Sequence, residues 1–133
     1  MTELNPKLTF PKSERLCSKT ILDRLFAEKR SLFAFPFRVV FLELETAEVP
    51  CQSVFTVPKR MFKRAVHRNA IRRKMREAFR LNKASFYSFL NENQKHVALM
   101  FIYIEKEEID FKKIEKGMKQ AFSKIEKTLK SVD

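Results

Sequence analysis

The sequence predicts a single mixed α+β domain, and three observations support this fold class. A chain of 133 residues has the length of one ordinary domain, and its 44% hydrophobic residues, 14 of them Phe, are enough to build a core. Some segments of the chain have apolar residues at the spacing of an amphipathic helix, and others have the alternating or continuous apolar residues of a strand. One Gly and five Pro argue against disorder. We expect the order α-β-β-(β)-α-β-α, where the bracketed strand is short, in an α+β or small α/β sandwich spanning residues 1–133.

The first half of the chain predicts one short helix and two strands. Residues 1–16 indicate an irregular N-terminal segment. Ser18 is a suitable N-cap for a short amphipathic helix from about Lys19 to Glu28. Phe35 to Glu45 is rich in Phe and Val and predicts a strand whose two faces are both largely apolar. Ser53 to Val57 predicts a second strand, which Pro58 ends.

The second half predicts a long helix, a buried strand and a final helix. The long helix should begin near Arg64 and reach about Leu81, with an extension toward Leu90 left open. Residues 96–104 are almost continuously apolar, which is typical of a strand covered on both sides. Asp110 is placed to cap the last helix. The core-facing stripe of the long helix consists of Ile71, Met75, Ala78 and Phe79.

Positive charge is concentrated in one part of the chain. Residues 59–80 hold ten Lys or Arg and a single carboxylate, Glu77, which gives +9 of the formal +12. At 100° per residue, five polar residues fall within an arc of roughly 100° beside the apolar stripe of the long helix. We call this set the arginine arc, and Arg68 lies at its edge; the arc consists of Asn69, Arg72, Arg73, Arg76 and Arg80.

Like charges at i, i+4 and i+8 destabilise an isolated helix by a few tenths of a kcal/mol per pair, and Arg68, Arg72 and Arg76 have this spacing. Exposed helix faces normally mix charge signs, so the arrangement favours a bound polyanion over a merely solvated face. The guanidinium fork suits phosphate oxygens. Nucleic acid is therefore the expected partner, although charge and spacing alone do not distinguish DNA from RNA.

Other functional classes find little support. No apolar run approaches the roughly 20 residues of a membrane span, and the N-terminus does not resemble a signal peptide, so we expect a cytoplasmic protein with no membrane partner. Cys17 and Cys51 are expected to be reduced, with a disulfide as the alternative. Metal-ligand spacing is absent. The basic window offers only His67 and Glu77 for acid–base chemistry, so no active site is expected in the polypeptide itself.

The residues of this basic window closely resemble a known signature. Val57-Pro58-Lys59-Arg60, followed by the run from Arg64 to Arg80 (RAVHRNAIRRKMREAFR), is similar to the motif of the bacterial ribonuclease P protein subunit. The resemblance continues in Phe10-Pro11-Lys12 with Arg15-Leu16, and in the order of the elements. It covers nearly the whole chain.

The resemblance implies a fold, a partner and a division of labour. The fold is an α-β sandwich with a left-handed βαβ crossover, like the second domain of ribosomal protein S5, whereas general rules favour a right-handed connection. The chain would be an accessory subunit of ribonuclease P, an endoribonuclease that removes the 5′ leader of precursor tRNA. The catalytic RNA would carry out hydrolysis with Mg²⁺ held mainly by RNA and substrate. No catalytic or metal-binding residue, and no stable protein partner, is expected for the polypeptide.

Carried over by position, the resemblance also implies site residues. A cleft for the single-stranded leader would lie between the first helix and the sheet, with Phe26, which matches a family aromatic residue, as one wall. Phe37 is expected as the second wall because it alternates on the strand that should face the first helix. Ordinary core is the alternative for both. Ala70 replaces a motif arginine, for which Lys74 is a partial substitute, and Leu22 replaces an aromatic residue. The residues expected to contact RNA are Lys59, Arg60, Arg64, Arg68, Asn69, Arg72, Arg73, Arg76 and Arg80.

Two other functions compete with this interpretation. A DNA-binding or ribosomal-type protein would use the same helix without a catalytic partner, and it would not prefer leader-bearing tRNA over mature tRNA. A stand-alone nuclease would cleave RNA after all bound RNA had been removed.

Overall fold

The predicted fold class is confirmed by the computed structural model, which describes residues 10–16, 18–28, 30–45 and 49–131. The expected extra short strand is present, but it is β1, which precedes the two predicted strands and forms a hairpin with the first of them, β2. The position expected for it, between the second strand and the long helix, is wrong. A short 3-10 helix at Lys12–Glu14 precedes the regular elements. These are α1 (Lys19–Ala27), β1 (Ser31–Ala34), β2 (Phe37–Leu44), β3 (Cys51–Thr56), α2 (Ala65–Glu92), β4 (His96–Tyr103) and α3 (Phe111–Ser131).

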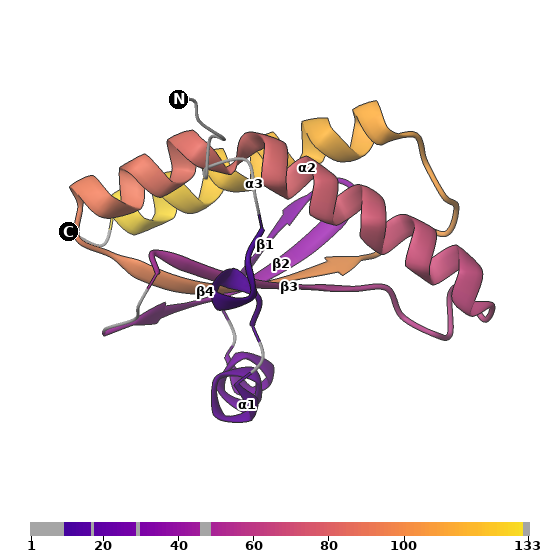
Figure 1. Ribbon diagram of the computed structural model, residues 1–133, viewed down its shortest axis with the longest axis horizontal. Coiled ribbons are helices and arrows are strands. Elements are labelled where there is room, and N and C mark those ends of the chain that lie inside the picture. Colours follow the sequence, from indigo (N-terminus) through magenta and orange to yellow (C-terminus); the bar gives the residue numbers. More distant parts are fainter. Residues whose placement is uncertain (1–9, 17, 29, 46–48, 132–133) are drawn as a thin grey trace.

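The four strands form one sheet with the order β1-β2-β4-β3. β2 pairs antiparallel with β1 and with β4, whereas β3 and β4 are parallel and are joined through α2. Helices α2 and α3 cover one face of the sheet, and α1 lies alone on the other (Figure 1). β4 therefore has helices on both sides, as its continuous apolar run predicts. The hand of the crossover stays an expectation from the family.

The main core lies between the sheet and the α2/α3 layer. Phe79 of α2 is at its centre, with ring centroids 5.5 Å from Phe55, 5.9 Å from Phe101 and 5.4 Å from Phe122, all in edge-on arrangements. The predicted stripe of α2 is fully buried, which confirms the rotation of this helix: Ile71, Met75, Ala78 and Phe79 are each 0% exposed.

A smaller core lies on the opposite face, under α1. Leu25 of α1 is buried there against Val40 and Leu42 of β2 and Met100 of β4. The Ser18 hydroxyl accepts a hydrogen bond of 3.3 Å from the Ile21 amide, so the predicted N-cap is confirmed. The short helix is thus fixed at its start and pinned along one side.

Two further predictions concern element ends and thiols. Asp110 Oδ1 accepts a 3.1 Å hydrogen bond from the Lys113 amide, so it caps α3 as expected. Cys51 is a free, fully buried thiol, and burial raises its pKa to about 12. Cys17 lies outside the described residues. Within the described part of the chain, none of the helices has the length and apolar character that crossing a bilayer demands.

Candidate nucleic-acid interface

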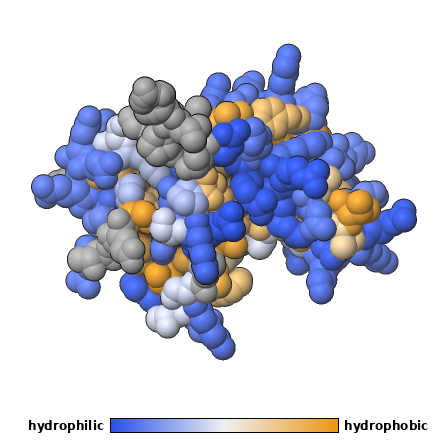
Figure 2. Space-filling view, in the orientation of Figure 1, coloured by the Kyte–Doolittle hydropathy of each residue, from blue (hydrophilic) through white to orange (hydrophobic). Residues whose placement is uncertain are grey.

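Helix α2 is a rigid platform for the basic residues. Its buried stripe contacts the sheet, so the neighbouring side of the helix is held toward solvent. Figure 2 shows strongly hydrophilic surface gathered over the half of α2 that begins the helix. Of the residues expected to contact RNA, six are exposed and three are half-buried. The exposed residues are Lys59, Arg60, Arg64, Asn69, Arg73 and Arg76; the half-buried ones are Arg68, Arg72 and Arg80.

Only one cation of this set is paired with a carboxylate among the described residues, namely Arg80. Its Nε and Nη2 donate to Glu77 at 3.1 and 2.6 Å. This hydrogen bonding lowers the pKa of Glu77 and raises that of Arg80. Both side chains of the pair are partly exposed to solvent, so a phosphate group can compete for Arg80 at small cost. The remaining cations of the set keep their charge available to a partner.

Arg68 has a structural task in addition to any contact with RNA. Its Nη1 donates to the carbonyl oxygens of Phe62 at 2.8 Å and Lys63 at 2.9 Å. These carbonyls belong to the loop that leads from β3 into α2. Arg68 therefore fixes the loop that carries Lys59 and Arg60. Within the arginine arc, Arg72 donates from Nη2 to the side-chain oxygen of Asn69.

Lys74, the partial substitute expected for the arginine that Ala70 replaces, is in an ion pair. Its Nζ binds Glu108 Oε2 at 2.8 Å and the Ile109 carbonyl oxygen at 3.1 Å. The side chain is thus committed to the loop between β4 and α3, on the flank away from the arginine arc. The local motif does not indicate this ion pair, because Glu108 lies 34 residues away in the chain. The partial substitution expected of Lys74 stays a prediction.

The two aromatic residues assigned to the leader cleft lie in very different places. Phe26 is on α1 and is 74% exposed, so its ring is available to a ligand. Phe37 is 0% exposed and packs edge-on against Phe101 at 5.8 Å in the α2/α3 core. It is on the face of the sheet opposite to α1. The expectation that Phe37 is a cleft wall is therefore wrong, and its alternative, ordinary core, is correct.

The side of the sheet that carries α1 offers other residues that sequence reasoning missed. Phe33 pairs with Arg38, Arg38 with Ile102, and Ile102 with Thr56, so these four form one row across all four strands. Because Arg38 alternates with the buried Phe37, the row faces the α1 side. Phe33 is 53% exposed and Arg38 is exposed. The alternation of buried and exposed residues along β2 could have shown that Arg38 faces the α1 side. Both faces of the strand are largely apolar, however, so the sequence did not show which face is which.

A buried ion pair fastens the N-terminal segment to α2. Lys83 Nζ is 2.5 Å from Glu14 Oε1, and the Tyr87 hydroxyl donates to the same oxygen at 2.7 Å. Lys83 is 1% exposed. Burial, followed by the nearby negative charges, raises the pKa of Tyr87, so its proton stays in place for this hydrogen bond. Neither Glu14 nor Lys83 was singled out from the sequence.

Among the described residues, no group of three or more His, Cys, Asp or Glu side chains is arranged to hold a metal ion. The acidic residues near α3 have structural contacts instead: Glu108 pairs with Lys74, and Asp110 caps the helix. What the described surface offers chemically is charge and aromatic area for binding.

Comparisons with known proteins agree with this geometry. The family model "Ribonuclease P" matches residues 10–126. A ribonuclease P protein component of Porphyromonas gingivalis is 33% identical over 121 residues, which cover 90% of this chain and 88% of the relative. One from Chlorobaculum tepidum is 32% identical over 101 residues, 70% of this chain and 66% of the relative.

Solved structures show the same fold. The RNase P protein of Staphylococcus aureus superposes with a TM-score of 0.68 at 17% identity, covering 86% of this chain and 96% of that protein. The RNase P protein of Thermotoga maritima gives 0.66 at 23% identity, with coverage of 84% and 96%. With a family model matching most of its length and a relative one-third identical over nine-tenths of it, the chain belongs to the ribonuclease P protein family.

Proposed function

We propose that this chain binds the catalytic RNA of ribonuclease P through the arginine arc and the preceding loop, and that it supports removal of the 5′ leader from precursor tRNA. The proposal rests on where the eight cations assigned to RNA contact lie and on how few of them are in ion pairs. All are on or beside one core-anchored helix, and Arg80 alone of them is in an ion pair within the described part of the chain. Such a face repels itself until phosphates neutralise it.

The chemistry of this face fits RNA docking. Each phosphate that it neutralises releases condensed counterions, so affinity should fall steeply with salt. Arg forks bind two phosphate oxygens, and Asn69 offers a donor and an acceptor for a 2′-hydroxyl. The buried stripe holds these groups in place before binding, so little conformational freedom is lost on docking.

The face of the sheet beside α1 is proposed to hold the single-stranded leader. The exposed rings of Phe26 and Phe33 are platforms for base stacking, which is worth about 1–3 kcal/mol per base and tolerates any sequence. Arg38 lies next to Phe33 across the β1–β2 pair and can contact a leader phosphate. This arrangement replaces the cleft in which Phe37 was a wall.

In the holoenzyme, Mg²⁺ supplies the metal chemistry of phosphodiester hydrolysis, and we assign it to the RNA and the substrate. The polypeptide orients the leader and screens repulsion between phosphates. It should therefore lower the magnesium concentration needed for cleavage.

Reconstitution with the cognate RNA tests the proposal. Leader cleavage at low Mg²⁺ should rise when the protein is added, and the gain should shrink with Arg72→Gln. Lys127→Gln is the matched control, because Lys127 is exposed on α3, which packs against α2 on the same side of the sheet.

Three results would contradict the proposal. No gain in cleavage on adding the protein rejects the accessory role. Equal binding of leader-bearing and mature tRNA by the holoenzyme favours a general nucleic-acid binder. Cleavage by an RNA-free preparation would show that the polypeptide is itself a nuclease.

A further inference from the structure

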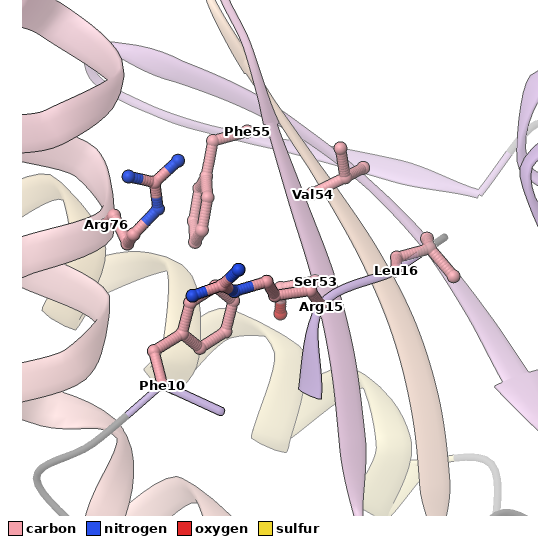
Figure 3. Close-up of a pocket in the computed structure, with 7 residues that line it drawn as sticks. All are labelled: Phe10, Arg15, Leu16, Ser53, Val54, Phe55 and Arg76. Atoms are coloured by element: carbon pink, nitrogen blue, oxygen red, sulfur yellow. The ribbon is translucent and has the colours of Figure 1, made fainter. Parts of the chain in front are cut away.

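A hollow of about 230 Å³ lies at the outer edge of β3, between the N-terminal segment and α2. Figure 3 shows the side chains of Arg15, from the N-terminal segment, and Arg76, from α2, reaching into this region beside the rings of Phe10 and Phe55. None of the described residues that line the hollow is acidic. Two guanidinium groups from distant parts of the sequence are therefore gathered in one place without a counter-charge.

The fold holds Arg15 there by several contacts. The Leu16 amide donates to the Ser53 carbonyl oxygen at 2.9 Å, which ties the segment to the edge of β3. The Arg15 guanidinium lies 5.9 Å from the centroid of the Phe10 ring. That ring packs on Phe55 at 5.8 Å, so one wall of the hollow also supports the cation.

The nearest carboxylates are already committed elsewhere. Glu14 adjoins Arg15 in the chain, but its Oε1 accepts from both Lys83 and Tyr87 in the buried cluster. Glu77 adjoins Arg76, but it forms the ion pair with Arg80. Within the described residues, no carboxylate is therefore paired with either arginine, and both can bind a ligand. Like charges gathered in this way are stabilised by an anion, and a phosphate matches the geometry of the guanidinium fork.

The position of the hollow indicates which phosphate it receives. Leu16 and Val54 on its wall belong to the small core under α1, whereas Phe10 and Phe55 belong to the α2/α3 side. The hollow thus lies where one face of the sheet meets the other, between the arginine arc and the α1 side. An RNA strand that contacts both surfaces by way of the β3 edge would pass this hollow.

We propose that Arg15 and Arg76 jointly bind one backbone phosphate of an RNA strand in this hollow. The proposal rests on the RNA-binding function proposed above. It adds Arg15 to the residues that contact RNA, a role that the resemblance to the family did not give to this residue. The site joins the arginine arc to the leader side of the molecule.

The test is a double-mutant cycle with Arg15→Gln, Arg76→Gln and the double variant, measured as the salt dependence of affinity for the cognate ribonuclease P RNA. Each contacted phosphate contributes about 0.7–0.9 to the slope of log K against log salt. If the arginines share one phosphate, the double variant should lose about one such increment. A loss of about two increments would show two separate phosphates and overturn the proposal.

Controls separate this proposal from the proposed function. Lys127→Gln should leave the slope unchanged, and Arg15→Lys, which keeps the charge, should restore most of it. If Arg72→Gln weakens RNA binding while Arg15→Gln does not, the shared site is wrong and the RNA-binding function stands. If none of the three arginine variants changes RNA affinity, both proposals fail.

A second arm uses inorganic phosphate with the isolated protein. Phosphate should raise the thermal unfolding midpoint of the wild type, and Arg15→Gln and Arg76→Gln should reduce that gain. A reduced gain without any loss of RNA affinity would make the hollow a site for free phosphate and would reject the RNA strand as its ligand. Loss of RNA affinity together with the reduced gain supports a backbone phosphate of the RNA strand as the ligand.

Discussion

Gly117 of α3 lies directly against the backbone carbonyl group of Phe35, at the turn between β1 and β2: a Cβ atom at position 117 would be 2.1 Å from the Phe35 oxygen. The same atom would be 2.8 Å from Cδ of Pro36. This contact brings the β1–β2 hairpin onto α3, and it explains why the only glycine of the chain is in the middle of a helix.

Gly117→Ala should therefore destabilise the protein, although glycine-to-alanine changes usually stabilise a helix. The methyl group has to displace backbone, and we expect a loss of about 1–3 kcal/mol in the free energy of unfolding, measured by urea titration. Ser123→Ala, at an exposed position of the same helix, is the control and should cost nothing. Equal effects of the two changes would contradict the close contact.

Breaking the buried ion pair should be costly, and removing both partners should cost much less. Glu14→Gln removes the charge of the carboxylate that pairs with Lys83, whose side chain is 1% exposed, and we expect a loss of about 3–5 kcal/mol in unfolding free energy. Adding Lys83→Met to that variant should recover most of the loss. A double variant less stable than Glu14→Gln alone would show that the pair is not the dominant interaction there.

Alkaline pH should destabilise the fold partly through Cys51. Burial raises its pKa from 9.0 to about 12, so the folded state holds the proton more tightly than the unfolded state. The resulting stability is fully present below pH 9 and is lost as pH rises from 9 to 12. The thiol should contribute a slope of up to about 1.4 kcal/mol per pH unit in this window. Cys51→Ala should flatten the curve by that amount; an unchanged curve would assign the loss to other groups.

Glu77→Gln should strengthen RNA binding. The change removes the single carboxylate of residues 59–80 and frees Arg80 from its ion pair. Both the affinity for the ribonuclease P RNA and its salt dependence should rise, the slope by up to about 0.7–0.9 if Arg80 gains a phosphate. Filter binding at several salt concentrations measures both quantities. A weaker complex would mean that Glu77 positions Arg80 for the RNA.

Phe26→Ala and Phe37→Ala should have opposite signatures. The exposed Phe26 should be replaceable without loss of stability, while the holoenzyme binds leader-bearing tRNA more weakly, by about 1–3 kcal/mol per lost stack, and mature tRNA as before. Phe37→Ala should cost about 3–5 kcal/mol of unfolding free energy as a core truncation. Equal effects of Phe26→Ala on the two tRNAs would remove Phe26 from the leader site.

The helical part of the site could be predicted because its signal is local. The stripe from Ile71 to Phe79 has one period and one apolar side, which fixes the rotation of α2 and hence the direction of Arg72 and Arg76. The RNA contacts themselves stay a prediction. The ends of β2 lie within two residues of expectation, whereas α2 continues to Glu92, past the expected Leu81 and the open extension toward Leu90. No Gly or Pro follows Leu81 to end the helix.

The features that sequence reasoning missed depend on contacts between residues that are far apart in the chain. Both sides of β2 are apolar, so alternation could not show whether Phe37 or its neighbour Arg38 faces α1. Lys74 and Lys83 look like ordinary members of a basic helix, yet each binds a carboxylate far away in the chain. A local motif carries no information about such pairs, and they decide which charges remain for RNA.

The ion pair between Glu14 and Lys83 also sets an order of events during synthesis. Glu14 leaves the ribosome 69 residues before Lys83 and 73 residues before Tyr87, so its anchor does not exist until most of α2 has emerged. The segment that carries Glu14 therefore docks only after much of α2 has been made. A chain that ends before α2 lacks both Arg76 and this anchor, so it cannot form the hollow that Arg15 and Arg76 line.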